Sequence, residues 1–380
     1  MSTGRMIFAI IIITGILGSS FFYVGRRIYQ ALEFLFPNID GRIFTCIYIV
    51  IALSFILGRM PLPFFLKGAV GWIGAHWLGL FIYFLLFFIA ADLIILIGRI
   101  AKLIPADMFL STRFYAGTAA ILLSAAVFCY GIYNARTIKF TSYDVQLNRS
   151  LSDEMNIVLI SDLHLGDIGS EKRIDDVVRG INSINPDIVC IAGDIFTDDY
   201  FRLKNPDKAS ALFRSIESAH GVYASLGNHD GGSTFSEMMD FLERSNIKVL
   251  NDEHVIIDDR LVLIGRLDSS PIGGFGGLAR KDFPEVIAPV DVSYPVVVME
   301  HNPARIGEYG YDADLILAGH THRGQLFPGG IFTKLIFAAD YGHYQKDANS
   351  PHVVVTQGAG TWMMPIRVGT NNEIVSVIVR

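Results

Sequence analysis

The chain has 380 residues, of which 51% are apolar and 18% charged, and its formal net charge at pH 7 is −6. Residues 1–140 carry 11 basic and 4 acidic side chains, whereas residues 141–380 carry 20 basic and 33 acidic ones. The acidic second part argues against binding of nucleic acid through its phosphates. The three cysteines, Cys46, Cys129 and Cys190, lie in apolar segments and indicate no disulfide framework.

The first part of the chain, residues 1–140, is predicted to be an α-helical membrane domain. It contains four apolar segments, each about long enough to cross a hydrocarbon layer roughly 30 Å thick. The small residues at 18–20 run directly into Phe21 and Phe22, which makes a poor processing site for a cleaved signal peptide. The sequence therefore predicts a multi-pass protein of the cell membrane with four spans, at 6–24, 41–58, 69–98 and 114–134.

The side of the membrane on which the second part lies is nearly undetermined. Six basic residues flank the four predicted spans on either side, so the positive-inside rule does not decide. A short basic amino terminus usually stays inside, which weakly favours a cytoplasmic second domain. Asp92 is an acidic residue deep in the third span, and such a residue is either functional or a helix-packing hydrogen-bond partner. We favour packing, against His76 or a serine of another span.

The second part, residues 141–380, alternates between short apolar runs and amphipathic segments, which is typical of an α/β fold. Helices are predicted at 171–184, 209–219 and 234–244, and strands at 141–147 and 374–379. A hairpin is predicted at 249–265, with Asp258 and Asp259 at its turn. The glycine-rich segment 269–278 is expected to be a surface loop, or else a lid, with Phe275 exposed at its tip.

Five short motifs carry the chemistry, and each directly follows an apolar run that reads as a buried strand. Side chains that leave the ends of adjacent strands converge on one edge of a sheet, where open α/β sheets place their sites. The motifs supply carboxylate, amide and imidazole groups: Asp162 and His164; Asp194; Asn228, His229 and Asp230; His301; and His320 and His322.

This set of oxygen and nitrogen ligands without a thiolate suits manganese, iron or zinc. One carboxylate, most plausibly Asp194, can bridge two cations, and two cations can clamp the attacking and leaving oxygens of a displacement at phosphorus. A single Asp-x-His would be weak evidence, because histidines near strands are usually structural. Five such elements in this order favour a dinuclear metal centre.

The order of these motifs resembles the calcineurin-like metallophosphoesterase superfamily over about residues 143–380. The resemblance implies an α/β fold of four layers, an αββα sandwich, as a domain at 141–380. It also implies that His229 acts as the acid or as a stabiliser of charge, oriented by Asp230. Two groups of ligands are implied: Asp162, His164, Asp194 and His322 for one metal, and Asp194, Asn228, His301 and His320 for the other.

The tail from Thr356 to Thr361, followed by Pro365-Ile366-Arg367, resembles the small membrane-associated bacterial branch, which includes enzymes that cleave a UDP-linked lipid A precursor. Two departures from that branch stand out. Arg323 follows the last histidine motif, where it would either contact a substrate phosphate or point away at the surface. Asp198 falls one place later than the acidic residue of many relatives, at a position that is not a metal ligand.

The expected function is hydrolysis of a phosphodiester or pyrophosphate bond, in a phospholipid or lipid-linked nucleotide, by hydroxide generated on two divalent cations. Manganese is the expected metal, with iron, zinc and magnesium as alternatives. The lipid bilayer is the expected partner, and Trp362 to Met364 could contact acyl chains or fill the core. Two alternatives stay open, a membrane-anchored phosphodiesterase of soluble nucleotides and a silent scaffold like the retromer member of the superfamily. Degenerate scaffolds usually lose the Asn-His pair, which is present here as Asn228 and His229.

Overall fold

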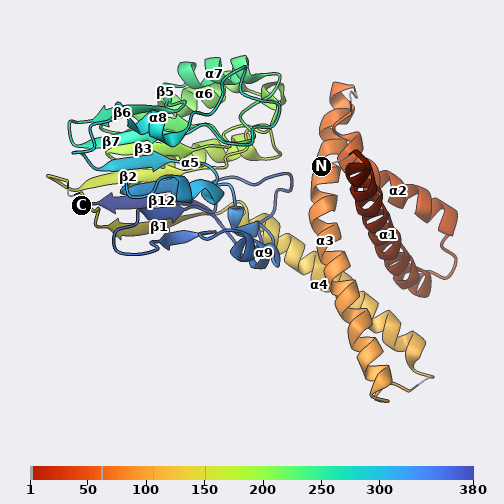
Figure 1. The fold of residues 1–380 in the computed structure, drawn as a ribbon. Helices are drawn as coiled ribbons and strands as arrows, with labels where there is room; N and C mark the ends of the chain where they lie inside the picture. The colour runs from red at the N-terminus through yellow and green to blue at the C-terminus, as the bar shows by residue number, and fades with distance from the viewer. Residues whose placement is uncertain (1–2, 61–62, 106, 150) are drawn as a thin grey trace. The chain divides into compact units, whose positions relative to one another are not determined.

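A computed structural model describes residues 3–60, 63–105, 107–149 and 151–380 (Figure 1). The chain divides into two compact units, Met1–Gly131 and Ile132–Arg380, which we call the helical unit and the sheet unit. The expected domain boundary at residue 140 falls later in the chain than this division. The last residues of the fourth helix therefore belong to the sheet unit.

Among its described residues, the helical unit consists of four helices: α1 (Thr3–Leu35), α2 (Gly41–Leu57), α3 (Phe64–Ile100) and α4 (Phe109–Asn134). Three stretches are long and apolar enough to cross a membrane, at Ile11–Leu35, Leu66–Ile100 and Phe109–Asn134. The first of them continues to Leu35 instead of ending near residue 24. The segment expected to be the second span is an apolar helix of only 17 residues, so the count of four spans is not confirmed.

The helices of this unit pack through aromatic residues, glycines and one polar cluster. Phe81, Phe84 and Phe88 of α3 form a small core with Val24 of α1. Asp92 accepts a hydrogen bond from the Tyr23 hydroxyl at 2.7 Å and lies 3.2 Å from a guanidinium nitrogen of Arg27. The carboxylate within the predicted span thus joins α3 to α1 as a packing residue, but its partners are Tyr23 and Arg27 instead of the expected His76 or a serine.

The sheet unit contains two sheets of six strands each within its described residues (Figure 1). The first runs in the order β1 (Ile138–Val145), β12 (Asn372–Val379), β2 (Met155–Ile160), β3 (Ile188–Ala192), β4 (Val222–Ser225), β5 (Ile247–Val249). The second runs in the order β10 (Gly342–Tyr344), β11 (His352–Val355), β9 (Leu315–Ala318), β8 (Val296–Met299), β7 (Leu261–Gly265), β6 (Glu253–Ile257). Parallel pairs dominate the centre of both sheets, so within each sheet the carboxyl ends of the central strands lie at the same edge.

The two sheets pack face to face because their central strands are apolar on both sides. Ile157 and Leu159 of β2 enter a core shared with Met299 and Leu317 of the second sheet. Alternate residues of the same strand, such as Val158, face a second core under three helices: α5 (Ser170–Ile184), α6 (Pro206–Arg214) and α7 (Phe235–Arg244). The protein is therefore a mixed α/β sandwich of two sheets, as predicted.

The outer face of the second sheet is covered by shorter elements. Phe283 and Val286 of α8 (Phe283–Ile287) pack there with Tyr309, which follows the 3₁₀ helix η2 (Pro303–Glu308). Two further 3₁₀ helices are η1 (Tyr200–Arg202) and η3 (His322–Gly324), and the last α-helix is α9 (Gly329–Ile336). Helix α9 contains no buried residue and lies outside all three cores of the sheet unit.

Several predicted elements differ from the structure in ways that local contacts explain. Helix α6 occupies Pro206–Arg214 instead of 209–219, because Asn205 caps it and a proline stands at its first position. The hairpin of β6 and β7 turns at Asp258 and Asp259 as predicted. The expectation that Phe275 is exposed is wrong. The glycine-rich loop folds back, and the ring is 2% exposed against Phe235.

Candidate metal centre

The five motifs meet at one edge of the sandwich because each follows the carboxyl end of a central strand. Asp162 follows β2, Asp194 follows β3 and Asn228 follows β4, and these three strands are parallel neighbours. His301 follows β8 and His320 follows β9, a parallel pair in the other sheet. Strand β3 contacts β8 across the core, which brings the two ligand-bearing edges together.

The backbone at this edge is held in an uncommon conformation. Asp162, His164, Asp194, His320 and His322 all have φ between +46° and +71°, in the left-handed region that side chains other than glycine rarely adopt. Such residues cost free energy and cluster at functional sites, where the surrounding structure holds them. The turns after the strands are therefore shaped to present these side chains.

The first group of candidate ligands comprises Asp162, His164 and His322, all of them buried. Nε2 of His164 lies 3.1 Å from Nε2 of His322, which lies 3.3 Å from a carboxylate oxygen of Asp162. The Asp162 carboxylate also accepts a hydrogen bond from the His320 main chain. Three metal-binding side chains thus point at one small volume.

The second group comprises Asp194, His301 and His320. His301 donates from Nδ1 to the carbonyl of Ala192 at 2.8 Å, which directs its Nε2 toward Asp194 at 3.2 Å. Nδ1 of His320 lies 3.2 Å from the same Nε2. A carbonyl that fixes the orientation of an imidazole is the usual support of a histidine ligand.

Asp194 lies between the two groups. Its Oδ2 is 3.2 Å from Nε2 of His301 in the second group and 3.8 Å from Nε2 of His164 in the first. Its Oδ1 accepts a hydrogen bond from the His229 main chain at 2.9 Å. This is the position that a bridging carboxylate needs.

The donor set fits two divalent cations. The ligand atoms within each group lie within 4.8 Å of one another, and every donor is a carboxylate or an imidazole. Oδ1 of Asn228 is buried without a hydrogen-bond partner, an arrangement that is costly unless a cation takes it up. The structure therefore supports a dinuclear site at these residues.

Protonation equilibria at the site agree with this fit. Burial, together with neighbouring charges, lowers the pKa of His164 to about 3 and that of His320 to about 4. Both imidazoles are then neutral at pH 7, the form that coordinates metals. Burial alone would lower the pKa of His301, but the Asp194 carboxylate, together with the charges of Asp162 and Asp268, raises that pKa well above its ordinary value. The space between these two side chains thus favours positive charge.

His229 is oriented by a different residue from the one expected. Its Nδ1 lies 2.5 Å from Oδ1 of Asp198, whereas the buried Asp230 carboxylate accepts hydrogen bonds from the main chains of Phe196 and Gly227. Asp230 therefore ties the loop after β3 to the loop after β4 and does not orient His229. Burial would lower the pKa of His229, but the hydrogen bond to Asp198 together with the charges of Asp194, Asp198 and Asp230 outweighs it and raises that pKa. The sequence feature that points to this role is Asp198 itself, the acidic residue that follows Gly193-Asp194 one place later than in many relatives.

The Arg323 side chain packs against an aromatic ring. Its guanidinium stacks on the ring of Tyr341, 4.4 Å from the centroid, and its main chain has φ of +49°. This contact gives Arg323 a packing partner, and a direct contact with a substrate phosphate stays a prediction.

Two buried residues that the sequence reasoning passed over support the ligand turns. Nη2 of Arg367 lies 3.1 Å from Nδ1 of His322 and donates to the carbonyl of Gln357 at 2.7 Å. Arg367 is held in turn by Asn134, the last residue of α4, whose amide donates to the Arg367 carbonyl at 3.1 Å. The Gln325 amide donates to the Trp362 carbonyl at 3.0 Å, which fixes the Trp362 loop to the turn that carries His322.

Residues 155–324 match the calcineurin-like phosphoesterase family. A metallophosphoesterase of Aquifex aeolicus is 31% identical over 249 residues, which cover 65% of this chain and 93% of that protein. The chain belongs to the calcineurin-like metallophosphoesterase family. A Campylobacter jejuni metallophosphoesterase is 30% identical over 262 residues, 67% of each chain. A Danio rerio relative described as a transmembrane protein with a metallophosphoesterase domain is 25% identical over 374 residues, 90% of this chain and 82% of that one.

Family membership makes the protein a metal-dependent phosphoesterase, in agreement with the two groups of candidate ligands. The three long apolar helices and the transmembrane relative together indicate a membrane protein. The silent-scaffold alternative fits poorly with a site at which six of the expected ligands converge in two groups.

Proposed function

We propose that this metallophosphoesterase hydrolyses a phosphodiester or pyrophosphate bond of a lipid-linked substrate at the membrane surface. The observation that carries the proposal is an exposed apolar helix, α9, which begins five residues after the turn at Gly324 that closes the histidine motif. A soluble substrate would give no reason for such a helix beside a phosphoesterase site.

Helix α9 exposes apolar side chains that a water-soluble domain would bury. Ile331 and Phe332 are 54% and 60% exposed, and Leu335 and Ile336 are 79% and 72% exposed. Concentrated exposed apolar surface marks an interaction site, and a short apolar helix of this kind suits the boundary between lipid headgroups and acyl chains. Lys334 on the same helix can reach lipid phosphates.

The same surface is connected to the candidate metal centre and to the end of a membrane helix. Leu326, just before α9, pairs with Val368, the neighbour of Arg367. Asn134 at the end of α4 donates to the carbonyls of Arg367 and Thr370, at 3.1 and 2.7 Å. Asn134, Leu326 and His322 therefore all contact the same short segment, residues 367–370. This arrangement favours a lipid bilayer as the partner of α9.

Trp362 offers an apolar contact on the substrate side. It is 40% exposed, and its ring centroid lies 5.7 Å from that of His229. Acyl groups near the scissile bond would find this ring beside the proposed acid.

In the proposed reaction, Asp162, His164 and His322 would hold one cation, and Asn228, His301 and His320 the other, with Asp194 shared. Two bound divalent cations would supply charge neutralisation at phosphorus and a nucleophilic water at neutral pH. The hydrogen bond from Nδ1 of His229 to Asp198 leaves Nε2 to protonate the leaving oxygen. Manganese is the proposed metal, because hard oxygen ligands and imidazoles suit it.

We further propose that α2 also crosses the bilayer, so that the chain has four spans and a cytoplasmic sheet unit. Single cysteines at Asn38 and Asp107, in a chain without Cys46, Cys129 and Cys190, would test this with an impermeant maleimide on intact cells. With four spans and a cytoplasmic sheet unit, Asn38 and Asp107 both lie in loops outside the cell, so both positions should be labelled. Labelling at only one of the two positions would exclude four spans.

The substrate class can be tested in cells. A strain that lacks the gene should accumulate one phosphate-containing lipid, and the wild-type gene should restore the lipid profile, whereas an Asp194→Ala gene should not. An unchanged lipid profile with an accumulating soluble nucleotide would replace the lipid-linked substrate with a nucleotide.

A further inference from the structure

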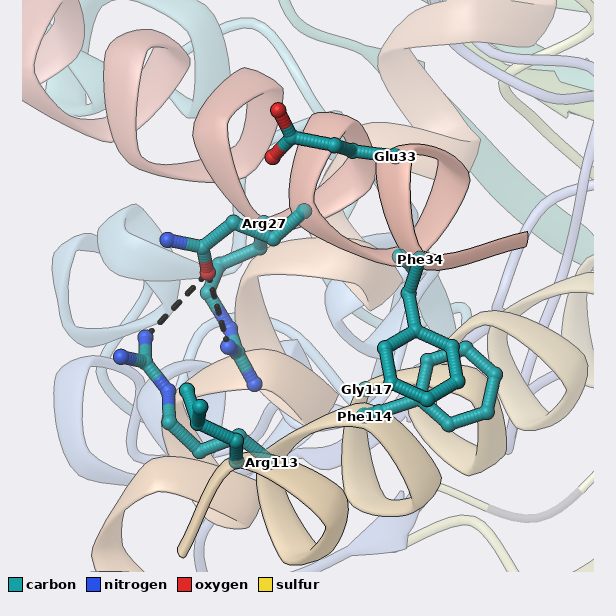
Figure 2. Close-up of a pocket in the computed structure, with 9 residues that line it drawn as sticks. Arg27, Glu33, Phe34, Arg113, Phe114 and Gly117 are labelled. Carbon is teal, nitrogen blue, oxygen red and sulfur yellow. Dashed lines mark hydrogen bonds between the residues drawn. The ribbon is translucent and has the colours of Figure 1, made fainter. Parts of the chain in front are cut away.

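The helical unit contains a cavity of about 370 Å³ lined by residues of α1 and α4. Figure 2 shows Arg27, Glu33 and Phe34 from α1 opposite Arg113, Phe114 and Gly117 from α4. Charged side chains within apolar helices are costly and mark functional positions unless they are fully paired. The pairing of these two arginines therefore decides what the cavity can bind.

One neutral oxygen holds both guanidinium groups together. Oε1 of Gln30 accepts from Nη1 of Arg27 at 3.1 Å and from Nη2 of Arg113 at 3.2 Å (Figure 2). Two like charges that converge on one amide oxygen repel each other, and a neutral acceptor compensates this only weakly. The arrangement becomes favourable when an anion occupies the same space.

The nearby carboxylates of Asp92 and Glu33 do not form ion pairs with both arginines. Asp92 lies 3.2 Å from Arg27, but Nε of Arg27 is buried without a hydrogen-bond partner and the residue is 4% exposed. Arg113 makes no ion pair with any residue in the described part of the chain, and besides its hydrogen bond to Gln30 it faces the Phe109 ring at 5.6 Å. The Glu33 carboxylate, which also lines the cavity, accepts a hydrogen bond from the Tyr29 hydroxyl at 3.3 Å and makes no ion pair with either arginine among the described residues. The guanidinium of Arg113 therefore has no ion-pair partner among the described residues, although Glu33 lines the same cavity.

Apolar side chains form part of the cavity wall and are exposed on the outer surface of the helices. Phe34 stacks on Phe114 with ring centroids 3.8 Å apart, and Phe34 and Leu110 are 57% and 75% exposed. Arg27 lies eight residues before the end of α1 and Arg113 four residues after the start of α4. At 1.5 Å per residue these positions are roughly 12 and 6 Å from the helix ends, within reach of headgroups for long side chains.

We propose that this cavity binds the phosphate of an anionic membrane lipid. Guanidinium groups match the geometry of phosphate oxygens, and paired arginines bind phosphate through short charge-assisted hydrogen bonds. Basic pockets between membrane helices recognise anionic headgroups in the same way. The aromatic wall and Leu110 supply contacts for an acyl chain. This site is separate from the candidate metal centre and does not depend on the proposed reaction.

Native mass spectrometry of the purified full chain in detergent tests the proposal. Dioleoyl phosphatidylglycerol should be retained as one tightly bound lipid, whereas dioleoyl phosphatidylcholine, with the same acyl chains and no net charge, should bind more weakly. An Arg113→Gln variant should bind phosphatidylglycerol about tenfold more weakly or worse, because one charged hydrogen-bond donor is lost. Arg113→Lys keeps the positive charge without the planar guanidinium, so it should bind phosphatidylglycerol with an affinity between those of the unchanged protein and Arg113→Gln.

Arg26→Gln is the control for the loss of one arginine from the helical unit, because Arg26 of α1 is the neighbour of Arg27, is exposed and does not line the cavity. It should retain the lipid as the unchanged protein does. Equal loss in the Arg26 and Arg113 variants, or no loss in the Arg113 variant, would overturn the proposal. Displacement of the lipid by inorganic phosphate at equal concentration would assign the cavity to a soluble anion instead.

Discussion

Nδ1 of His229 lies 2.5 Å from Oδ1 of Asp198, while the carboxylate of Asp230, the next residue in the chain, faces main-chain N–H groups. The two acidic residues near the proposed acid thus divide two tasks. Asp198 orients the imidazole and stabilises its positive charge. Asp230 holds together the two loops that present Asp194 and Asn228.

Replacing Asp198 with Asn should therefore slow turnover by roughly 10- to 100-fold, the usual effect of losing a residue that supports a site from behind. The loss should be larger for alkyl than for aryl phosphodiesters, because poor leaving groups need protonation most. Metal content should not change. Asp230→Asn is the comparison, and it should lower the melting temperature without any preference for the leaving group. Equal losses for aryl and alkyl esters with Asp198→Asn would contradict the acid role of His229.

Replacing Asp194 with Ala should abolish hydrolysis and reduce bound metal, since its carboxylate lies between the two ligand groups. Metal analysis of the purified full chain by inductively coupled plasma mass spectrometry measures this directly. The Asp198→Asn variant serves as the control, because it removes a charge near the site without removing a ligand. Two metals per chain in the Asp194 variant would show that the carboxylate does not bridge.

Gly227→Ala should disrupt the centre without removing any ligand. A methyl group at this position would overlap the Asp194 carboxylate, and the tight approach of the two loops leaves no room for it. Overpacking of this kind costs about 1–3 kcal/mol, so we expect a lower melting temperature together with lost metal. Gly307→Ala is the control, because a methyl group there meets nothing within 4 Å. Normal metal content in the Gly227 variant would show that Asp194 can move without consequence.

The double variant Ile331→Ser/Leu335→Ser should lose at least tenfold in turnover of a lipid substrate in vesicles, since each side chain contributes on the order of 1.5–3 kcal/mol when buried in an apolar phase. Hydrolysis of bis-p-nitrophenyl phosphate should fall far less. Ile256→Ser/Tyr311→Ser, at exposed apolar positions away from α9, is the matched control. Equal effects of the two double variants on lipid turnover would show that α9 has no specific role in binding the lipid surface.

The parts of this site that the sequence predicted are those governed by local pattern. Each ligand follows a run of apolar residues, and such runs become central strands wherever both faces are covered. The carboxyl ends of these strands then place Asp162 and Asp194 at the edge of the first sheet and His301 at the edge of the second, without any knowledge of the loops. The hairpin at Asp258 and Asp259 followed from turn chemistry in the same way.

The parts that escaped prediction depend on how loops fold against one another. Asp198 reaches His229 because its main chain, with φ of +54°, donates to the His229 carbonyl at 3.2 Å. Phe275 is buried because a run of glycines turns the loop inward, although the local composition is that of a surface loop. Helix α9 is apolar enough to enter a core, and only the tertiary structure shows that it lies outside one.

The central claim is that the metal centre acts on a lipid-linked phosphate. Phosphorus-31 NMR of the full chain with Mn²⁺ tests it most directly, in mixed micelles that contain a bacterial lipid extract and, separately, with a mixture of soluble nucleotides. We expect loss of one lipid phosphodiester or pyrophosphate signal, with a new phosphomonoester, and no such change with Asp194→Ala. Hydrolysis of nucleotides at a comparable rate, with every lipid signal unchanged, would contradict it.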